Sequence, residues 1–270
     1  MKTWTKNQVI TYTILLVLLI VDLSLSLLVL IYRDSFSPSS KDVNADRLEF
    51  WITILYGLIL FGSFPLITLV ITLNQDQLQK LNIDKFYFVL LIACGLAGLY
   101  SLPYNCFAGI AAIYAVYTLL VHKARFGIAD ESALRIILLI VGVFAGILIC
   151  MIGLVDATKI DILRAEQWTK DFIFDTIPIS VYQEAVFRGI LYMFLKDLNL
   201  SESKIFYTQA FLFWITHIHY LFQSPVFFWI IIPASGLIFG YLAFRTKSIT
   251  PSAIAHILSN ALIGFSELVW

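Results

Sequence analysis

The stretch VITYTILLVLLIVDLSLSLLVLIY, residues 9–32, decides the fold class of this chain. An α-helix rises about 1.5 Å per residue, so about 20 apolar residues cross the hydrocarbon core of a bilayer, which is roughly 30 Å thick. Lys2 and Lys6 precede the stretch, as in a signal peptide, but it is too long and lacks a small-residue cleavage site. We therefore predict a retained first membrane-spanning helix.

The composition of the whole chain agrees with a membrane protein. Of the 270 residues, 60% are apolar and only 13% are charged, whereas a soluble domain carries about 25% charged residues. A disordered chain lacks this much apolar mass. Eighteen basic residues balance eighteen acidic ones, so the basic excess of a nucleic-acid-binding protein is absent and we expect no nucleic-acid partner. The prediction is an all-α, polytopic transmembrane helical bundle surrounded by membrane lipid.

Further apolar stretches predict eight or nine membrane-spanning helices in total. Pro103 breaks the longest stretch, because proline cannot continue a helix, so its halves form either two short spans or one re-entrant hairpin. Residues 156–172 mix charges with Ile, Leu and Trp and predict an amphipathic helix at the membrane interface. This helix closes an N-terminal unit, residues 1–172, and precedes a second unit, residues 173–270. The later spans are expected at residues 50–72, 86–121, 133–155, 173–195, 204–222, 225–245 and 249–269.

The Lys and Arg residues outside the spans predict the orientation, because cytoplasmic loops carry an excess of positive charge. With nine spans and a cytoplasmic N-terminus, the inner segments hold ten of these residues and the outer segments hold six. We therefore expect a cytoplasmic N-terminus. The inner residues are Lys2, Lys6, Lys80, Lys85, Lys123, Arg125, Lys196, Lys204, Arg245 and Lys247, and the outer ones are Arg33, Lys41, Arg47, Lys159, Arg164 and Lys170.

Ionisable side chains within the predicted spans concentrate in the last four, where each is costly and needs a reason. In VYQEAVFRGI, residues 181–190, Glu184 and Arg188 are four apart and share one helix face, so they can form an ion pair. Such a pair either fixes helix packing or belongs to a functional site. Gln183 lies about 100° around the helix from Glu184.

The next span carries two histidines in FLFWITHIHY, residues 211–220. His217 follows Phe213 by four residues and shares its helix face. His219 is two residues further and would point to nearly the opposite side of a helix. We therefore expect only one of the two histidines to share a site with Glu184, and we place His219 at the membrane interface.

The last span pairs a histidine with an asparagine in SITPSAIAHILSNALIGF, residues 248–265. His256 and Asn260 are four apart on one face, among small residues that allow neighbouring helices to approach closely. An asparagine alone often serves only to hold two membrane helices together. The first span contains an aspartate, Asp22, among serines, and we interpret it as a polar residue that serves helix packing.

The order ExxxR, FxxxH and HxxxN on three of the last four spans resembles the CPBP family of CAAX proteases and bacteriocin-processing or self-immunity proteins. The segments that carry the resemblance are EAVFRG at 184–189, FWITH at 213–217 and ITPSAIAHILSN at 249–260. The resemblance implies an intramembrane protease fold in a bacterial plasma membrane. It assigns catalytic roles to Glu184, His217, His256 and Asn260, and supporting roles to Gln183, Arg188 and Phe213.

The chain departs from the family pattern at one position. The family motif begins with two adjacent glutamates, of which the first is thought to activate water, and Gln183 occupies that first place. An amide cannot take a proton from water at neutral pH. Glu184 would have to turn into the cavity to replace it, and the helical phase disfavours that. The resemblance therefore implies the fold more firmly than the activity.

Three functions stay open on these residues. The first, implied by the resemblance, is an intramembrane endopeptidase that cleaves a peptide, a leader or a prenylated tail with water activated by glutamate and histidine. The second is a catalytically impaired relative that binds a membrane protein as a scaffold, regulator or bacteriocin self-immunity protein. The third is an unrelated transporter or channel. Two histidines and a glutamate also resemble a zinc ligand set, but the water mechanism needs no metal, and we predict no cofactor.

Overall fold

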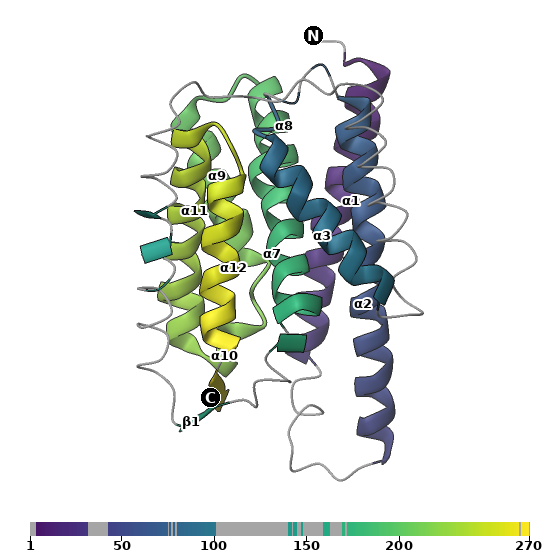
Figure 1. Ribbon diagram of the computed structural model, residues 1–270, viewed down its shortest axis with the longest axis vertical. Helices are drawn as coiled ribbons and strands as arrows, with labels where there is room; N and C mark the ends of the chain where they lie inside the picture. The colour runs from purple at the N-terminus through teal and green to yellow at the C-terminus, as the bar shows by residue number, and fades with distance from the viewer. Residues whose placement is uncertain are drawn as a thin grey trace.

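Long apolar runs become helices because a helix satisfies its own backbone hydrogen bonds, which lipid cannot do. In the computed structural model most of these helices stand side by side along one common direction (Figure 1). The structure describes residues 4–31, 43–74, 76, 78, 80–100, 140–141, 143–144, 147, 159–162, 169–170, 172–264 and 266–269.

The N-terminal part of the bundle contains three described helices. They are α1 (Lys6–Ile31), α2 (Val43–Leu73) and α3 (Lys85–Tyr100). α1 confirms the helix predicted from residues 9–32. α3 covers the first half of the predicted stretch 86–121, whose break at Pro103 lies outside the described residues.

The C-terminal part is built from one long composite helix and several further helices. The composite helix contains two π-helical turns, one before α7 and one after it. Its segments are Phe172–Thr176 (π), α7 (Ile177–Glu184), Ala185–Ile190 (π) and α8 (Leu191–Asp197). The elements after it are α9 (Glu202–Ile215), α10 (Tyr220–Gln223), the π-helical turn Phe227–Ile231, α11 (Ile232–Thr246) and α12 (Thr250–Gly264).

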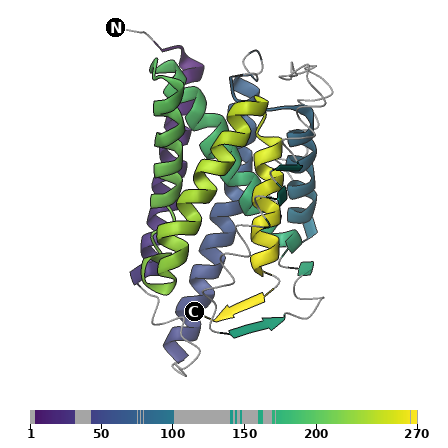
Figure 2. The same ribbon diagram turned by 90° about the vertical axis from the view of Figure 1, so that its left-hand side faces the viewer.

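The composite helix lies at the centre of the bundle. α1, α2 and α3 pack against it from one side, while α9 and α12 pack against it from the other. α11 packs mainly on α9 and α12. The two views of the ribbon show this arrangement, with the C-terminal helices gathered on one side of the molecule (Figures 1 and 2).

The structure confirms a helical bundle, and two short strands accompany its helices. β1 (Lys159–Ile162) pairs antiparallel with β2 (Ser266–Val269), and Lys159 lies opposite Val269. The predicted amphipathic helix over 156–172 is therefore wrong at 159–162, and the last predicted span ends before 266. The sequence KIDI alternates apolar and polar residues with the period of a strand, and its pairing partner lies about a hundred residues away along the chain.

The number of spans stays a prediction. Among the described residues two helices are long and apolar enough to cross a membrane, Lys6–Ile31 and Phe227–Thr246. Two shorter apolar helices are found at Ile59–Leu73 and Lys85–Ala97. The helix predicted over 204–222 is shorter than expected, because α9 ends at Ile215 and a turn follows it.

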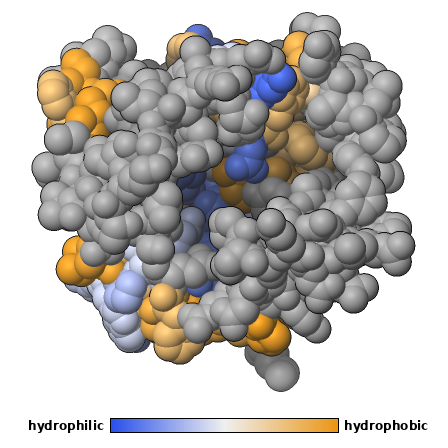
Figure 3. Space-filling model, turned by 90° about the horizontal axis from the view of Figure 1, so that it is seen from below, coloured by the Kyte–Doolittle hydropathy of each residue, from blue (hydrophilic) through white to orange (hydrophobic). Residues whose placement is uncertain are grey.

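Polar side chains lie at both ends of the bundle. At the upper end in Figure 1, Asp84 accepts hydrogen bonds from the backbone N–H groups of Phe86 and Tyr87 and from the hydroxyl groups of Ser248 and Thr250. This carboxylate therefore ties the start of α3 to the start of α12. Seen from the lower end, hydrophilic side chains lie at the bottom of a hollow (Figure 3).

Candidate active site

Glu184, the last residue of α7, is fully buried and is engaged by three side chains. Ser252 of α12 donates its hydroxyl hydrogen to Oε2, and Nδ1 of His256 lies 2.9 Å from Oε1. Nη1 of Arg188 lies 3.2 Å from the same Oε1, which confirms the predicted ion pair. The carboxylate of Glu184 therefore joins the composite helix to α12 and has few lone pairs left for a substrate.

Arg188 lies in the π-helical turn that follows α7 and is held on all sides by protein. Its Nη2 donates to the backbone oxygen of Gly236 in α11 at 3.2 Å. Its guanidinium carbon lies 4.5 Å from the ring centroid of Phe213, a distance at which the cation is attracted to the aromatic face. Arg188 thus neutralises and positions Glu184 from within the core.

His256 is fixed by its Nδ1 atom and by two aromatic rings. Its ring stacks on Phe239 at a centroid distance of 4.7 Å, and the edge-on ring of Phe213 is 5.7 Å away. Since the carboxylate of Glu184 can only accept, the nitrogen that faces it at 2.9 Å carries the hydrogen. In the neutral ring the lone pair of His256 is therefore at Nε2.

His217 is fixed in the same way from another element. Its Nδ1 lies 2.7 Å from the backbone oxygen of Phe213, and its ring lies 4.6 Å from the Phe213 ring. A carbonyl oxygen only accepts, so Nδ1 donates and Nε2 again keeps the lone pair. The Phe213 ring thus contacts both imidazoles, those of His217 and His256.

The position of His219 corrects the sequence-based geometry. His217 and His219 lie in the turn after α9, not in a helix, and their ring centroids are 6.0 Å apart. Backbone bonds from His217 to Trp214 and from Tyr220 to His217 span three residues, so the chain winds more tightly than an α-helix. His219 packs beside Tyr220, with ring centroids 4.2 Å apart.

Asn260 extends the site one turn along α12 from His256. Its Nδ2 donates to Oγ of Ser180 at 3.2 Å, and Ser180 in turn donates to the backbone oxygen of Thr176. This contact leaves a second N–H on the Asn260 amide, since the group carries two donors. Asn260 therefore lies across from α7, on the same face of α12 as His256.

The comparisons with known proteins fall on this same segment. Residues 166–262 match the family model described as Type II CAAX prenyl endopeptidase Rce1-like. This segment, about a third of the chain, is therefore similar to the CAAX protease family. No curated protein and no solved structure matches the chain. The family and the apolar helices together identify an integral membrane protein.

All the motif residues named from the sequence lie within the CAAX protease segment, and the structure brings most of them around one aromatic ring. Phe213 contacts Arg188, His217 and His256, and the last of these contacts Glu184. Asn260 lies one turn further along α12. Sequence reasoning therefore identified the correct neighbours, although it could not show that three side chains contact the carboxylate oxygens of Glu184.

Gln183 occupies the place that the CAAX protease motif gives to its first glutamate. Its side chain is 9% exposed, whereas Glu184 is completely buried. Along α7, Tyr182 points to α1 and Glu184 points to α12, as their hydrogen bonds show. Because successive helical residues are about 100° apart, Gln183 faces the space between those two helices.

A polar stripe on α1 borders this space and was not recognised as part of a site from the sequence. Asp22 Oδ1 accepts a hydrogen bond of 2.8 Å from the hydroxyl of Tyr182. One turn further along α1, Ser26 donates to the backbone oxygen of Thr216 and lies 3.3 Å from Nδ1 of His219. The spacing of Asp22 and Ser26, four residues on one helix face, was the available signal.

Ser252 is the second residue that sequence reasoning treated only as a small packing residue. It lies four residues before His256, so both side chains face Glu184 from one side of α12. The same spacing that predicted the pairing of His256 with Asn260 could have predicted this contact. Among the described residues, no group of three His, Cys, Asp or Glu side chains converges as metal ligands would.

Proposed function

We propose that this protein is an intramembrane endopeptidase that hydrolyses a peptide bond with water. The observation that carries the proposal is the matched pair of imidazoles: Nδ1 of His256 donates to Glu184, and Nδ1 of His217 donates to the Phe213 backbone. Each ring therefore presents a lone pair at Nε2, fixed in direction by the protein. Two such acceptors, one from α12 and one from the turn after α9, can hold one water molecule beside a bound peptide bond.

The amide side chains supply the complementary chemistry. A peptide carbonyl becomes more negative on oxygen as water attacks its carbon, and N–H groups aimed at that oxygen stabilise the transition state. Gln183 cannot take a proton from water, but its amide can donate to this oxygen. Asn260 keeps one N–H after its contact with Ser180 and can do the same.

The buried Glu184–Arg188 pair has a supporting role in this proposal. The carboxylate of Glu184 accepts the Nδ1–H of His256 at 2.9 Å and so keeps the Nε2 lone pair of that ring directed at the water. Arg188 keeps the carboxylate ionised and in place at 3.2 Å. The pair is fully buried, so water does not weaken its field.

The charge distribution supports an orientation with the N-terminus in the cytoplasm. Among the described residues, seven Lys and Arg gather at the upper end of the bundle in Figure 1. At this end α1, α3 and α9 begin, and α2, α8 and α11 end. Such an excess of positive charge is typical of the cytoplasmic side. The turn with His217 and His219 lies at the opposite end. The substrate would then enter from the extracytoplasmic side. The seven are Lys6, Lys80, Lys85, Lys196, Lys204, Arg245 and Lys247.

One cleavage experiment tests the proposal. The full chain is purified into lipid nanodiscs and given two quenched-fluorescence peptides, one ending in a farnesylated CAAX sequence and one an unprenylated apolar leader. His217→Asn and His256→Asn keep a donor at the Nδ1 position and remove Nε2. Each should lower kcat by about a hundredfold or more, while Tyr207→Phe on the exposed face of α9 serves as the matched control.

The outcomes of this experiment separate the alternatives. Cleavage that is equal in the wild type and in both histidine variants would show that the imidazoles do not act on water. Products identified by mass spectrometry show which probe is cut and at which bond. A preference for either peptide assigns the substrate class, because the two probes differ in the prenyl group and in their C-terminal sequence.

A second candidate function rests on Gln183 and Glu184, the residues at the two places where the family motif has adjacent glutamates. Gln183 is an amide, and Glu184 is bound by Ser252, His256 and Arg188. A cleft with these properties can bind a peptide or a membrane-protein segment without cutting it, as a scaffold or self-immunity protein would. Binding of either probe peptide with no product after prolonged incubation would favour this function.

A further inference from the structure

Asp22 is a half-buried acidic residue in the apolar helix α1, and the motif residues do not use its carboxylate. Its Oδ1 accepts the hydroxyl hydrogen of Tyr182, but its Oδ2 is buried and has no hydrogen-bond partner among the described groups. An ionisable side chain in a membrane helix is costly, and buried polar atoms without partners are rare. A role in packing alone needs only the oxygen that Tyr182 already uses.

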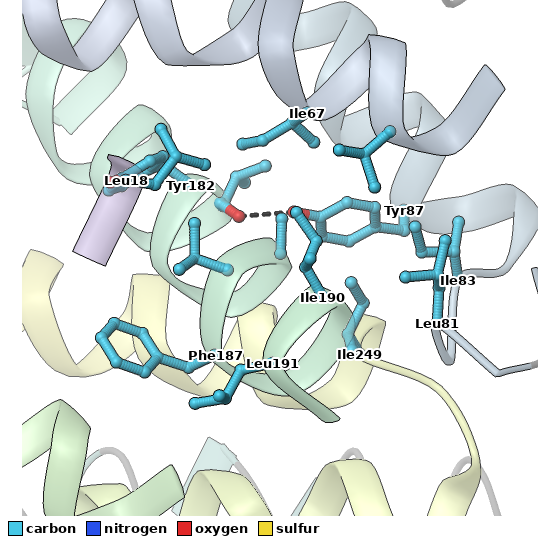
Figure 4. Packing of buried hydrophobic residues seen from close by; sticks show 14 of the residues in the cluster. Leu18, Ile67, Leu81, Ile83, Tyr87, Tyr182, Phe187, Ile190, Leu191 and Ile249 are labelled. Carbon is cyan, nitrogen blue, oxygen red and sulfur yellow. Dashed lines mark hydrogen bonds between the residues drawn. The ribbon is translucent and has the colours of Figure 1, made fainter. Parts of the chain in front are cut away.

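The position of Asp22 is fixed by contacts on two sides. Tyr182, its hydrogen-bond donor, immediately precedes Gln183 in α7. Ser26, one helical turn along the same face of α1, contacts the turn that carries His217 and His219. Leu18, one turn in the other direction, lies beside Tyr182 in the core (Figure 4).

These contacts place Asp22 on the border of the reaction space. One turn of helix is about 5.4 Å, so Asp22 lies about that far along α1 from the serine that contacts the histidine turn. Gln183 faces the space between α1 and α12, as its place between Tyr182 and Glu184 requires. Asp22, Gln183 and His217 therefore border the same space from three separate elements.

We propose that Asp22 is the proton acceptor for the attacking water and supplies the carboxylate that Gln183 lacks. The proposal rests on the endopeptidase function. Glu184 cannot take this part, because Ser252, His256 and Arg188 occupy its oxygens. Asp22 has one oxygen held by Tyr182, while the other has no hydrogen-bond partner in the part of the chain that the structure describes.

The reaction balances with this assignment. The water oxygen forms a bond to the carbonyl carbon, one water proton passes to Oδ2 of Asp22, and the carbonyl electron pair moves to its oxygen. The tetrahedral intermediate then collapses, the C–N bond breaks, and the proton on Asp22 passes to the leaving nitrogen. One water molecule is consumed, a carboxyl group and an amine are formed, and Asp22 returns to its ionised form.

The test uses Asp22→Asn, which keeps the oxygen that Tyr182 contacts but cannot take a proton. In nanodiscs, with the two probe peptides, this change should lower kcat by about a hundredfold or more. Tyr182→Phe removes the hydrogen bond and keeps the carboxylate, so it should cost less than about tenfold, as the loss of one neutral hydrogen bond does. Asp22→Glu keeps a carboxylate and should retain measurable cleavage.

The decisive variant is the double change of Asp22→Asn with Gln183→Glu. It restores a carboxylate to the reaction space from α7 instead of α1, and cleavage should recover at least tenfold over Asp22→Asn alone. If the role of Asp22 were purely structural, Asp22→Asn would cost little, since it keeps the contact with Tyr182, and there would be no loss of cleavage to recover. Size-exclusion profiles and melting temperatures verify that each variant is folded.

The results distinguish the failure of this assignment from the failure of the endopeptidase function. If the wild type cleaves a probe and Asp22→Asn cleaves it equally, the role of Asp22 is overturned and the endopeptidase stands. Equal losses in Asp22→Asn and Tyr182→Phe, or an absence of recovery in the double variant, overturn it as well. If the wild type cleaves neither probe, the endopeptidase function fails first and this assignment falls with it.

Discussion

Removing either partner of the Glu184–Arg188 pair should destabilise the protein, and the two removals should differ in size. Breaking a buried ion pair costs about 3–5 kcal/mol, because the remaining charge is left uncompensated. In Glu184→Gln, Arg188 stays charged, since arginine does not lose its proton in proteins. It keeps the Gly236 oxygen and nearby aromatic rings, of which that of Phe213 lies closer than those of Phe187 and Phe239.

The reverse change leaves a charge that the site can neutralise. In Arg188→Met, Glu184 keeps the hydroxyl of Ser252 and the Nδ1–H of His256, and His256 can take up a proton to form a new ion pair. We therefore expect a loss of about 4–5 kcal/mol for Glu184→Gln and about 2–3 kcal/mol for Arg188→Met. The double variant removes both charges and should lose less than the sum of the two.

The free energy of unfolding can be measured by titrating the detergent-solubilised protein with SDS, with melting temperature as a second measure. For a chain of this size, 1 kcal/mol corresponds to about 2–4 °C, so Glu184→Gln should lower the melting temperature by about 8 °C or more. The reasoning is refuted if Glu184→Gln costs less than about 1 kcal/mol, or if the two single losses simply add in the double variant.

Three further predictions test the packing and the orientation. Gly236→Ala should destabilise the protein by about 1–3 kcal/mol in a denaturant titration, because its Cβ would come within 3.3 Å of the Phe213 side chain, whereas Gly62→Ala, with no described atom within 4 Å, should be neutral or stabilising. Asp84→Ala removes a helix cap and two side-chain partners, so a loss of about 1–3 kcal/mol is expected, and an unchanged melting temperature would contradict the role of Asp84 as a clamp. In a cysteine-free background, a membrane-impermeant maleimide added to intact cells should label a cysteine at position 225 and not one at position 203; the reverse pattern would invert the proposed orientation.

Local periodicity made much of the C-terminal site predictable. Residues four apart on a helix share a face whatever the helix packs against, so the Glu184–Arg188 pair and the common face of His256 and Asn260 could be inferred before any fold was known. Apolar length alone predicted α1. These inferences depend only on the geometry of a single helix.

Other features depended on segments that are distant in the chain. The strand pairing of Lys159 with Val269 requires two segments about a hundred residues apart to meet, and no local pattern specifies that meeting. The turn that holds His217 and His219 begins where α9 stops, although the apolar sequence continues past that point. Hydrophobicity marks a buried segment but does not say where its helix ends.

The sequence by itself determined that the chain is a helical membrane protein with a CAAX protease segment, because apolar length and the spacing of motif residues are properties of neighbouring positions. The tertiary structure alone decided which carboxylate is available. Helix packing brings Ser252, His256 and Arg188 onto Glu184. One oxygen of Asp22 has no partner among the residues that the structure describes. Whether a buried acceptor is saturated depends on donors from other helices, and only the packing of the bundle supplies them.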